Sequence, residues 1–186
     1  MLHKTILMSI KPKYVEKILK GEKTAEFRRS MYSSIKKGDQ VFIYSSSPQK
    51  ALVGKFIIDE IINDTVENLW KLKGKEGCIS YEEFMNYYDG ISSGHCLVLK
   101  EIITFSAPIK LEELRSQIVN FRVPQSCRYL RPDEIEIFFK IPIASSSKKS
   151  RFFGLSYAMD GVIRNETFIE TDIAAIFVNC LRSGAN

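Results

Sequence analysis

Three charged side chains of mixed sign lie close together in the segment formed by residues 21–28. Lys23, Glu26 and Arg28 occur where apolar and polar residues alternate, which predicts a short β-strand from residue 24 to residue 28. Because successive side chains of a strand point to opposite faces, Glu26 and Arg28 are expected to share one face. Such charges are costly to bury unpaired, so they indicate a paired site, a ligand site or contact with water. An exposed edge strand is the alternative interpretation.

A lysine beside an acid and an arginine can serve either binding or catalysis. In a binding module, Lys23 and Arg28 supply positive charge for a phosphate or a carbonyl oxygen, and Arg28 can bind it through two hydrogen bonds. In an enzyme, Lys23 and Glu26 are the expected catalytic residues. A desolvated lysine beside cationic Arg28 can act as a base, and a lysine and an acid can share acid–base work on a 2′-hydroxyl of RNA. Both classes stay open, and we favour the binding module.

Short strands and helices are expected to position these residues. An apolar run predicts a buried strand over residues 5–10, and Pro12 begins an amphipathic helix that Gly21 ends. A serine and a glutamate in the spacing of a capping box, Ser80 and Glu83, begin a later helix, with Tyr87 on its buried side. Further strands are expected over residues 41–44, 51–62 (bent at Gly54) and 96–103, an edge or turn over 105–109, and helices near 66–72, 111–114 and 132–139.

The chain is expected to form one main domain over residues 1–144. Residues 145–150 are rich in serine and lysine and are the best candidate for a linker. Residues 151–186 are apolar enough to fold against the main domain as a hairpin or a helix. Residues 145–186 are therefore interpreted as a linker and a C-terminal extension of unknown role.

The composition is that of an ordinary globular protein. It says more about where the protein is located than about what the protein does. Of the 186 residues 45% are apolar, but no run is long enough to cross a bilayer, and the first residues lack the pattern of a secretory signal. A cytoplasmic location without membrane contact follows. The four cysteines are scattered, so buried free thiols are expected rather than a metal site or disulfides, and no cofactor is expected.

Positive charge is concentrated at the start of the chain. Residues 1–50 contain eleven Lys or Arg and four Asp or Glu, a net charge of +7, whereas the other 136 residues contain sixteen basic and eighteen acidic side chains. This asymmetry favours an anionic partner for the first 50 residues, above all a nucleic acid. A lysine-rich solvated surface is the alternative.

The segment around the three charges resembles a known family signature. Its residues match the pattern Ser9-Ile10-Lys11-Pro12-x-Tyr14-x-x-x-Ile18-Leu19-x-Gly21-x-Lys23-x-x-Glu26-x-Arg28. This pattern is similar to that of ASCH domains, members of the PUA-like superfamily. Further similar stretches follow in the same order at residues 44–48, 53–56, 70, 77–84 and 124–129. The resemblance covers about residues 4–132.

The resemblance implies an α+β fold: a PUA-like mixed β-barrel flanked by short helices, with a basic cleft around the GxKxxExR segment. It also implies RNA or a nucleotide-like ligand as partner, with recognition of a modified base, RNA metabolism or transcription-linked regulation as roles; it names no protein partner. The expected ligand contacts are Lys11, Lys23, Glu26, Arg28, Tyr44, Ser45, Ser46 and Ser47, followed by Gln125, Ser126 and Arg128. Tyr44 is expected to stack on a base and the three serines to bind a phosphate. A core position for Tyr44 and a structural salt bridge for Arg128 are the alternatives.

One branch of the family resembles the chain in the same segment and removes the acetyl group from N4-acetylcytidine. That activity uses a lysine, a threonine and a more distant glutamate. The lysine corresponds to Lys23, but the threonine position holds Glu26, and Glu76 is only a loose candidate for the distant glutamate. An amidohydrolase of this kind, like a ribonuclease, is therefore kept as the alternative to a binding module.

Overall fold

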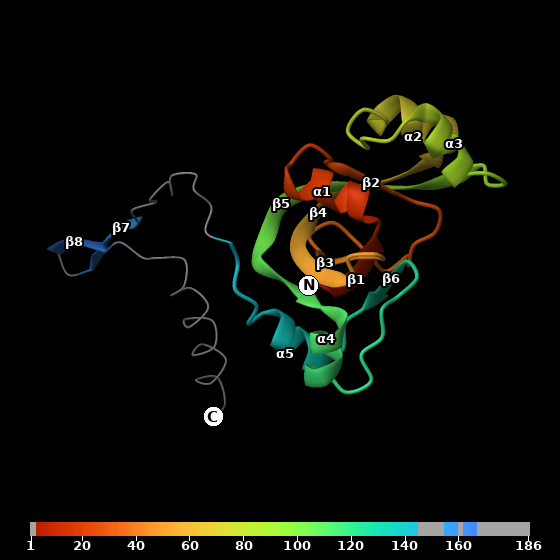
Figure 1. The fold of residues 1–186 in the computed structure, drawn as a ribbon. Helices are drawn as coiled ribbons and strands as arrows, with labels where there is room; N and C mark the ends of the chain where they lie inside the picture. The colour runs from red at the N-terminus through yellow and green to blue at the C-terminus, as the bar shows by residue number, and fades with distance from the viewer. Residues whose placement is uncertain (1–2, 145–154, 160–161, 167–186) are drawn as a thin grey trace. The chain divides into compact units, whose positions relative to one another are not determined.

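The computed structural model describes residues 3–144, 155–159 and 162–166 (Figure 1). The chain divides into two compact units, residues 1–145 and 146–186, which are described separately. The strands of the first unit are β1 (Thr5–Ile10), β2 (Ala25–Arg28), β3 (Gln40–Ser45), β4 (Ala51–Thr65), β5 (Ser93–Lys110) and β6 (Cys127–Tyr129). Its helices are α1 (Pro12–Leu19), α2 (Val66–Lys73), α3 (Tyr81–Tyr87), α4 (Leu111–Gln117) and α5 (Pro132–Phe138).

The six strands form one mixed sheet that curls into a half-barrel (Figure 1). Their order is β2-β5-β4-β3-β1-β6, in which β1 and β3 are parallel and the other neighbours are antiparallel. The short helices flank this sheet. The α+β fold with a PUA-like mixed barrel that the sequence predicts is thus confirmed.

Curvature of the sheet is concentrated in the long hairpin of β4 and β5. The register of this pair shifts at three places along β4, and such bulges bend a strand. Gly54 lies at one of them, as expected, and a Cβ atom there would lie 2.4 Å from the Ile103 carbonyl oxygen. Residues 105–109 lie at an edge, as expected: this part of β5 pairs with β4 alone, apart from an isolated bridge between Phe105 and Ile143 among the described residues.

Helix α1 packs on the sheet and delivers the chain to β2. Pro12 stands in its first turn, and Val15 and Ile18 are buried in the core. After the helix, Gly21 has a φ of 75°, which glycine adopts without steric cost. The backbone N–H groups of Glu22 and Lys23 then donate to the Lys17 carbonyl, so the chain turns back sharply.

The alternation within β2 separates an apolar face from a charged one. Ala25 and Phe27 belong to a core cluster with residues of α2, α3 and β5, including Cys96. Burial raises the pKa of the Cys96 thiol to about 12. The other face of β2 carries Glu26 and Arg28. Period-two alternation therefore places the charged pair on the side of the strand away from this cluster.

The second unit contains two described strands, β7 (Leu155–Met159) and β8 (Val162–Glu166), which pair antiparallel. The expected linker at residues 145–150 lies outside the described residues, as does Cys180. That residues 145–186 pack on the main domain stays a prediction. No helix in the described part of the chain is long and apolar enough to cross a membrane.

Candidate functional site

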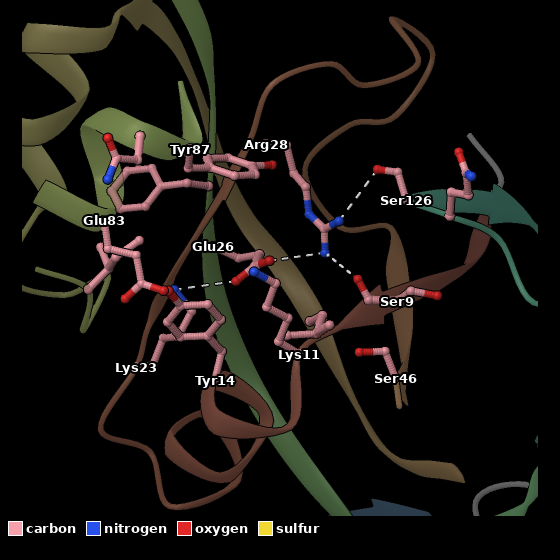
Figure 2. A pocket seen from close by; sticks show the side chains of 15 residues that line it. Ser9, Lys11, Tyr14, Lys23, Glu26, Arg28, Ser46, Glu83, Tyr87 and Ser126 are labelled. Atoms are coloured by element: carbon pink, nitrogen blue, oxygen red, sulfur yellow. Dashed lines mark hydrogen bonds and ion pairs between the residues drawn. The ribbon is translucent and has the colours of Figure 1, made fainter. Parts of the chain in front are cut away.

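A cavity of about 560 Å³ opens beside α1 and β2 (Figure 2). The first 46 residues contribute β1, α1, β2 and the residue after β3, whereas α3, the loop before it and the segment before β6 supply the rest. Its lining residues are Ser9, Ile10, Lys11, Tyr14, Lys23, Glu26, Phe27, Arg28, Ser46, Ile79, Glu83, Asn86, Tyr87, Gln125 and Ser126. This size lies within the range of small-molecule pockets.

Glu26 lies between two cations at the base of the cavity. Its carboxylate oxygens are 3.3 Å from Lys23 Nζ and 3.0 Å from Arg28 Nη2. The three side chains are only 3%, 9% and 8% exposed for Lys23, Glu26 and Arg28. Strand β2 does lie at the edge of the sheet, but all four of its residues are buried. The interpretation as an exposed edge strand is therefore wrong, and the three charges form a buried ionic triad.

Lys23 is held by the protein rather than presented to a ligand. Its Nζ donates to the carbonyl oxygens of Ala25 at 2.6 Å and Gly77 at 2.7 Å, in addition to the contact with Glu26. It also lies 5.1 Å from the ring centroid of Tyr14. The two carbonyls take up two of the three donors of the ammonium, and the ion pair with Glu26 neutralises its charge. A free lysine base at this position, which the sequence suggests for an enzyme, is not what the geometry provides.

Arg28 connects the triad to two other segments of the cavity wall. Its Nη2 donates to the Ser9 carbonyl at 3.0 Å, and its Nη1 donates to Ser126 Oγ at 3.4 Å (Figure 2). Its Nε is buried without a hydrogen-bond partner among the described residues. Arg28 therefore fixes β1 and the segment before β6 relative to β2, and the buried Nε–H is a donor left unused.

Two tyrosines and a carboxylate surround the mouth of the cavity. Tyr87 of α3 is 36% exposed, so it does not lie on a fully buried helix face as the sequence suggests. Burial, followed by a hydrogen bond to Glu83, raises the pKa of Tyr14. The ion pair with Lys13 lowers the pKa of Glu83. At neutral pH the tyrosine hydroxyl is thus a donor, and the carboxylate is ionised.

Of the remaining predicted site residues, four reach the cavity. Lys11, Ser46, Gln125 and Ser126 all line it, from three separate segments of the chain. The sequence pattern did not single out the roles of Tyr14, Tyr87, Glu83 and Asn86. Tyr14 belongs to the family signature, whereas the α3 residues are about 60 positions away from β2 and no local pattern connects them to it.

Three predicted contacts of β3 and the turn after it lie elsewhere. Tyr44 is 3% exposed and belongs to the core cluster beneath α4 and α5, and Ser45 is fully buried. The face of β3 that carries Tyr44 packs against residues of α4 and α5, and its opposite face packs in another core cluster, which explains this burial. Ser47 is exposed and lines a neighbouring groove instead. Tyr44 lines the same groove and not the cavity, whereas the fully buried Ser45 lines neither, so phosphate binding by Ser45 is corrected.

Arg128 is a structural residue in this geometry. Its Nη1 and Nη2 donate to the two carboxylate oxygens of Glu134, both at 2.7 Å, and Glu134 is fully buried. Its Nε donates to the Arg122 carbonyl at 2.9 Å. The salt-bridge alternative thus describes Arg128, and its expected place among the ligand contacts is corrected because its donors are committed to the protein.

The set of groups used for N4-acetylcytidine is not assembled here. Glu26, in the place of the threonine, has no hydroxyl and is bound within the triad. Glu76 does not line the cavity, and its carboxylate lies 3.8 Å from Lys73 Nζ. Among the described residues no group of three or more His, Cys, Asp or Glu side chains is arranged to hold a metal ion.

Comparison with known proteins identifies the family. The model of the ASCH domain matches residues 8–116, which contain α1, the triad and α3. The chain belongs to the ASCH domain family. Residues 125 and 126, which complete the cavity of this ASCH domain, lie beyond the matched segment.

Two relatives of the ASCH domain differ in how much of their length they share with it. An ASCH domain-containing ribonuclease of Zymomonas mobilis is 29% identical over 133 residues, 72% of this chain and 88% of that protein. The large ribosomal subunit protein uL22 of Ureaplasma parvum is 30% identical over 110 residues, which is 35% of that protein. The crystal structure of ASCH from Zymomonas mobilis has a TM-score of 0.67 at 27% identity and covers 74% of this chain and 96% of that one.

Proposed function

We propose that this ASCH domain binds single-stranded RNA and receives one base in the cavity beside β2. The observation that carries the proposal is the combination of aromatic walls with charges that are already neutralised within the protein. Tyr14 and Tyr87 offer ring surfaces at the mouth, whereas Glu26 is paired with both cations of the triad. Unstacked bases bind to proteins by stacking on aromatic rings and by hydrogen bonds to their edges.

The polar groups that remain available suit the edge of a base. Asn86, Gln125 and Ser126 line the cavity with side chains that both donate and accept hydrogen bonds. Lys11 is exposed at the rim, within reach of a phosphate attached to the bound nucleoside. Recognition of a modified base is the finer form of the proposal, because a cavity lined by several segments of the chain contacts the substituents of a base on several sides.

Stacking on Tyr87 gives the first test. Tyr87→Ala is expected to weaken the binding of a fluorescent single-stranded RNA about tenfold, because base–aromatic stacking contributes about 1–3 kcal/mol. Tyr81→Ala is the matched control: Tyr81 belongs to the same helix and is 56% exposed, but it packs on Trp70 outside the cavity. Fluorescence anisotropy at several salt concentrations measures both. Equal weakening by the two variants, or no binding of RNA at low salt, would refute the proposal.

RNA cleavage is a second candidate, favoured by the relative named as a ribonuclease, of which the match covers 88%. Acid–base cleavage transfers the 2′-hydroxyl proton to a base, forms a bond from that oxygen to the adjacent phosphorus, and protonates the departing 5′-oxygen. Lys23 and Glu26 are bound to each other and to the backbone. Glu83 is therefore the better candidate base, since it is ionised and lies at the mouth of the cavity.

Glu83→Gln tests this second candidate. The wild-type protein is expected to release RNA fragments with 2′,3′-cyclic phosphate ends, and the variant to release them about 100-fold more slowly. This is the lower end of the range for acid–base catalysis, because a lowered pKa makes Glu83 a weak base. The neighbouring, exposed Glu82→Gln serves as control. Mass spectrometry of the products decides: intact RNA after long incubation leaves a binding module without catalysis.

A further inference from the structure

A second depression adjoins the cavity and is here called the groove. It has a volume of about 550 Å³ and shares Ser9, Ser46 and Gln125 with the cavity as lining residues. The groove is further lined by Tyr44, Ser47, Lys50, Leu111, Arg115, Phe121, Arg122, Val123 and Pro124. Because the two depressions share part of their walls, a ligand that fills one and extends past Gln125 enters the other.

In the part of the chain that the structure describes, the cations of the groove are not paired with acids, unlike the buried cations of the cavity. Three exposed cations line it: Lys50 before β4, Arg115 in α4 and Arg122 between α4 and β6. No acidic residue is part of its lining, and within the described residues none of the three cations forms an ion pair. The cations of the cavity, in contrast, face Glu26 and Glu83.

This difference assigns separate parts of a nucleic acid to the two depressions. A neutral planar base fits the cavity with its internally balanced charges, and a row of phosphates fits the acid-free groove. We propose that the groove is a phosphate-binding subsite for the nucleotides that adjoin the base in the cavity, so the ligand is an RNA strand rather than a free nucleotide. This inference rests on the proposed binding of single-stranded RNA.

The walls of the groove support an extended strand. Phe121, Val123 and Pro124 supply an apolar side. The three cations come from three segments of the chain: the turn before β4, α4, and the segment between α4 and β6. Arg122 is held in place through its backbone, since its carbonyl accepts a hydrogen bond from Arg128 Nε. Its exposed guanidinium is free to approach phosphate oxygens, which accept two parallel hydrogen bonds from one guanidinium.

A double variant, Arg115→Gln with Arg122→Gln, tests the subsite. Both side chains are exposed, so the fold is expected to persist, and circular dichroism checks this. Binding of a single-stranded RNA oligonucleotide is expected to weaken at least about tenfold at low salt. The slope of log K against log salt is expected to fall by about 1.4, since each phosphate contact on a single strand contributes about 0.7. Lys71→Gln, a change of an exposed lysine in α2, serves as the charge control.

RNA binding by the wild type, the double variant and Tyr87→Ala distinguishes this inference from the proposed function. If wild-type and double variant bind the oligonucleotide equally and with equal salt slopes, while Tyr87→Ala still weakens binding, the groove is not a phosphate subsite and the RNA proposal stands. If a nucleoside monophosphate binds as tightly as the oligonucleotide, the groove is likewise refuted. If Tyr87→Ala and the double variant both leave binding unchanged, both proposals fail.

Discussion

Glu26→Gln is expected to lower the free energy of unfolding by about 3 kcal/mol. The substitution keeps the shape of the side chain but leaves Lys23 and Arg28 buried without a counter-charge, at 3% and 8% exposure. Removing one partner of a buried ion pair costs more than the pair contributes, because the remaining charge stays desolvated. Urea unfolding followed by circular dichroism measures the change, with equal m-values as the sign that only stability has changed.

The control for Glu26→Gln is the same substitution at an exposed glutamate that is also paired with a lysine. Glu16→Gln removes the exposed ion pair with Lys20, in which the side chains are 66% and 57% exposed, and is expected to leave the free energy of unfolding nearly unchanged. If both variants are equally stable, the triad is not desolvated in solution. A third variant, Glu26→Leu with Lys23→Met and Arg28→Leu, is expected to recover most of the stability, because apolar side chains replace buried ion groups well.

The triple variant also separates structure from function. A folded protein without the triad lacks the Arg28 contacts to Ser9 and Ser126, which connect three segments of the cavity wall. We therefore expect its RNA affinity to stay low although its stability returns. Unchanged affinity in that variant would show that the triad serves the fold alone.

The charged face of β2 could be predicted from the sequence because it depends on local geometry. The alternation through Ala25, Glu26, Phe27 and Arg28 fixes which side chains share a face, whatever the strand packs against. The end of α1 at Gly21 is similarly local. These features place Glu26 and Arg28 on one face without any tertiary contact, whereas Lys23 precedes β2 and is held beside them by the carbonyls of Ala25 and Gly77.

The buried position of Tyr44 results from tertiary packing. In β3, Val41 and Ile43 belong to one core cluster, and Phe42 and Tyr44 belong to another. Both faces of the strand are thus covered, so Tyr44 is only 3% exposed although it lines the groove. The second cover comes from α4 and α5, which follow β3 by more than 60 residues and cannot be inferred from its own pattern.

Tertiary packing also decides which residues of α3 face the cavity, and the sequence does not predict this. Ser80 begins the helix as the capping box predicts, and its side chain accepts a hydrogen bond from the Glu83 backbone N–H. The capping signal fixes where the helix starts but not what it faces. Tyr87 joins the cavity because α3 lies opposite β2 and α1, an arrangement produced by the packing of Phe84 on Phe27.

Glu134→Gln is expected to be about as destabilising as the change in the triad. The fully buried carboxylate accepts two hydrogen bonds from Arg128 and one from the Arg131 backbone N–H at 2.8 Å. Loss of its charge leaves the Arg128 guanidinium without a counter-ion, which is expected to lower the free energy of unfolding by about 3 kcal/mol. Urea unfolding again gives the measurement, and Glu136→Gln, an exposed neighbour in α5, is the control.

Arg128→Lys distinguishes a structural arginine from one that binds RNA. A lysine keeps the positive charge that a phosphate requires but cannot form two parallel hydrogen bonds with Glu134 or hold the Arg122 carbonyl at the same time. A structural role therefore predicts a loss of about 2 kcal/mol in unfolding free energy, because buried polar partners are left partly unpaired. Full stability combined with weaker RNA binding would instead return Arg128 to the ligand contacts. Since the arginine holds the backbone at Arg122, any loss of affinity in Arg128→Lys should disappear when Arg122→Gln is already present.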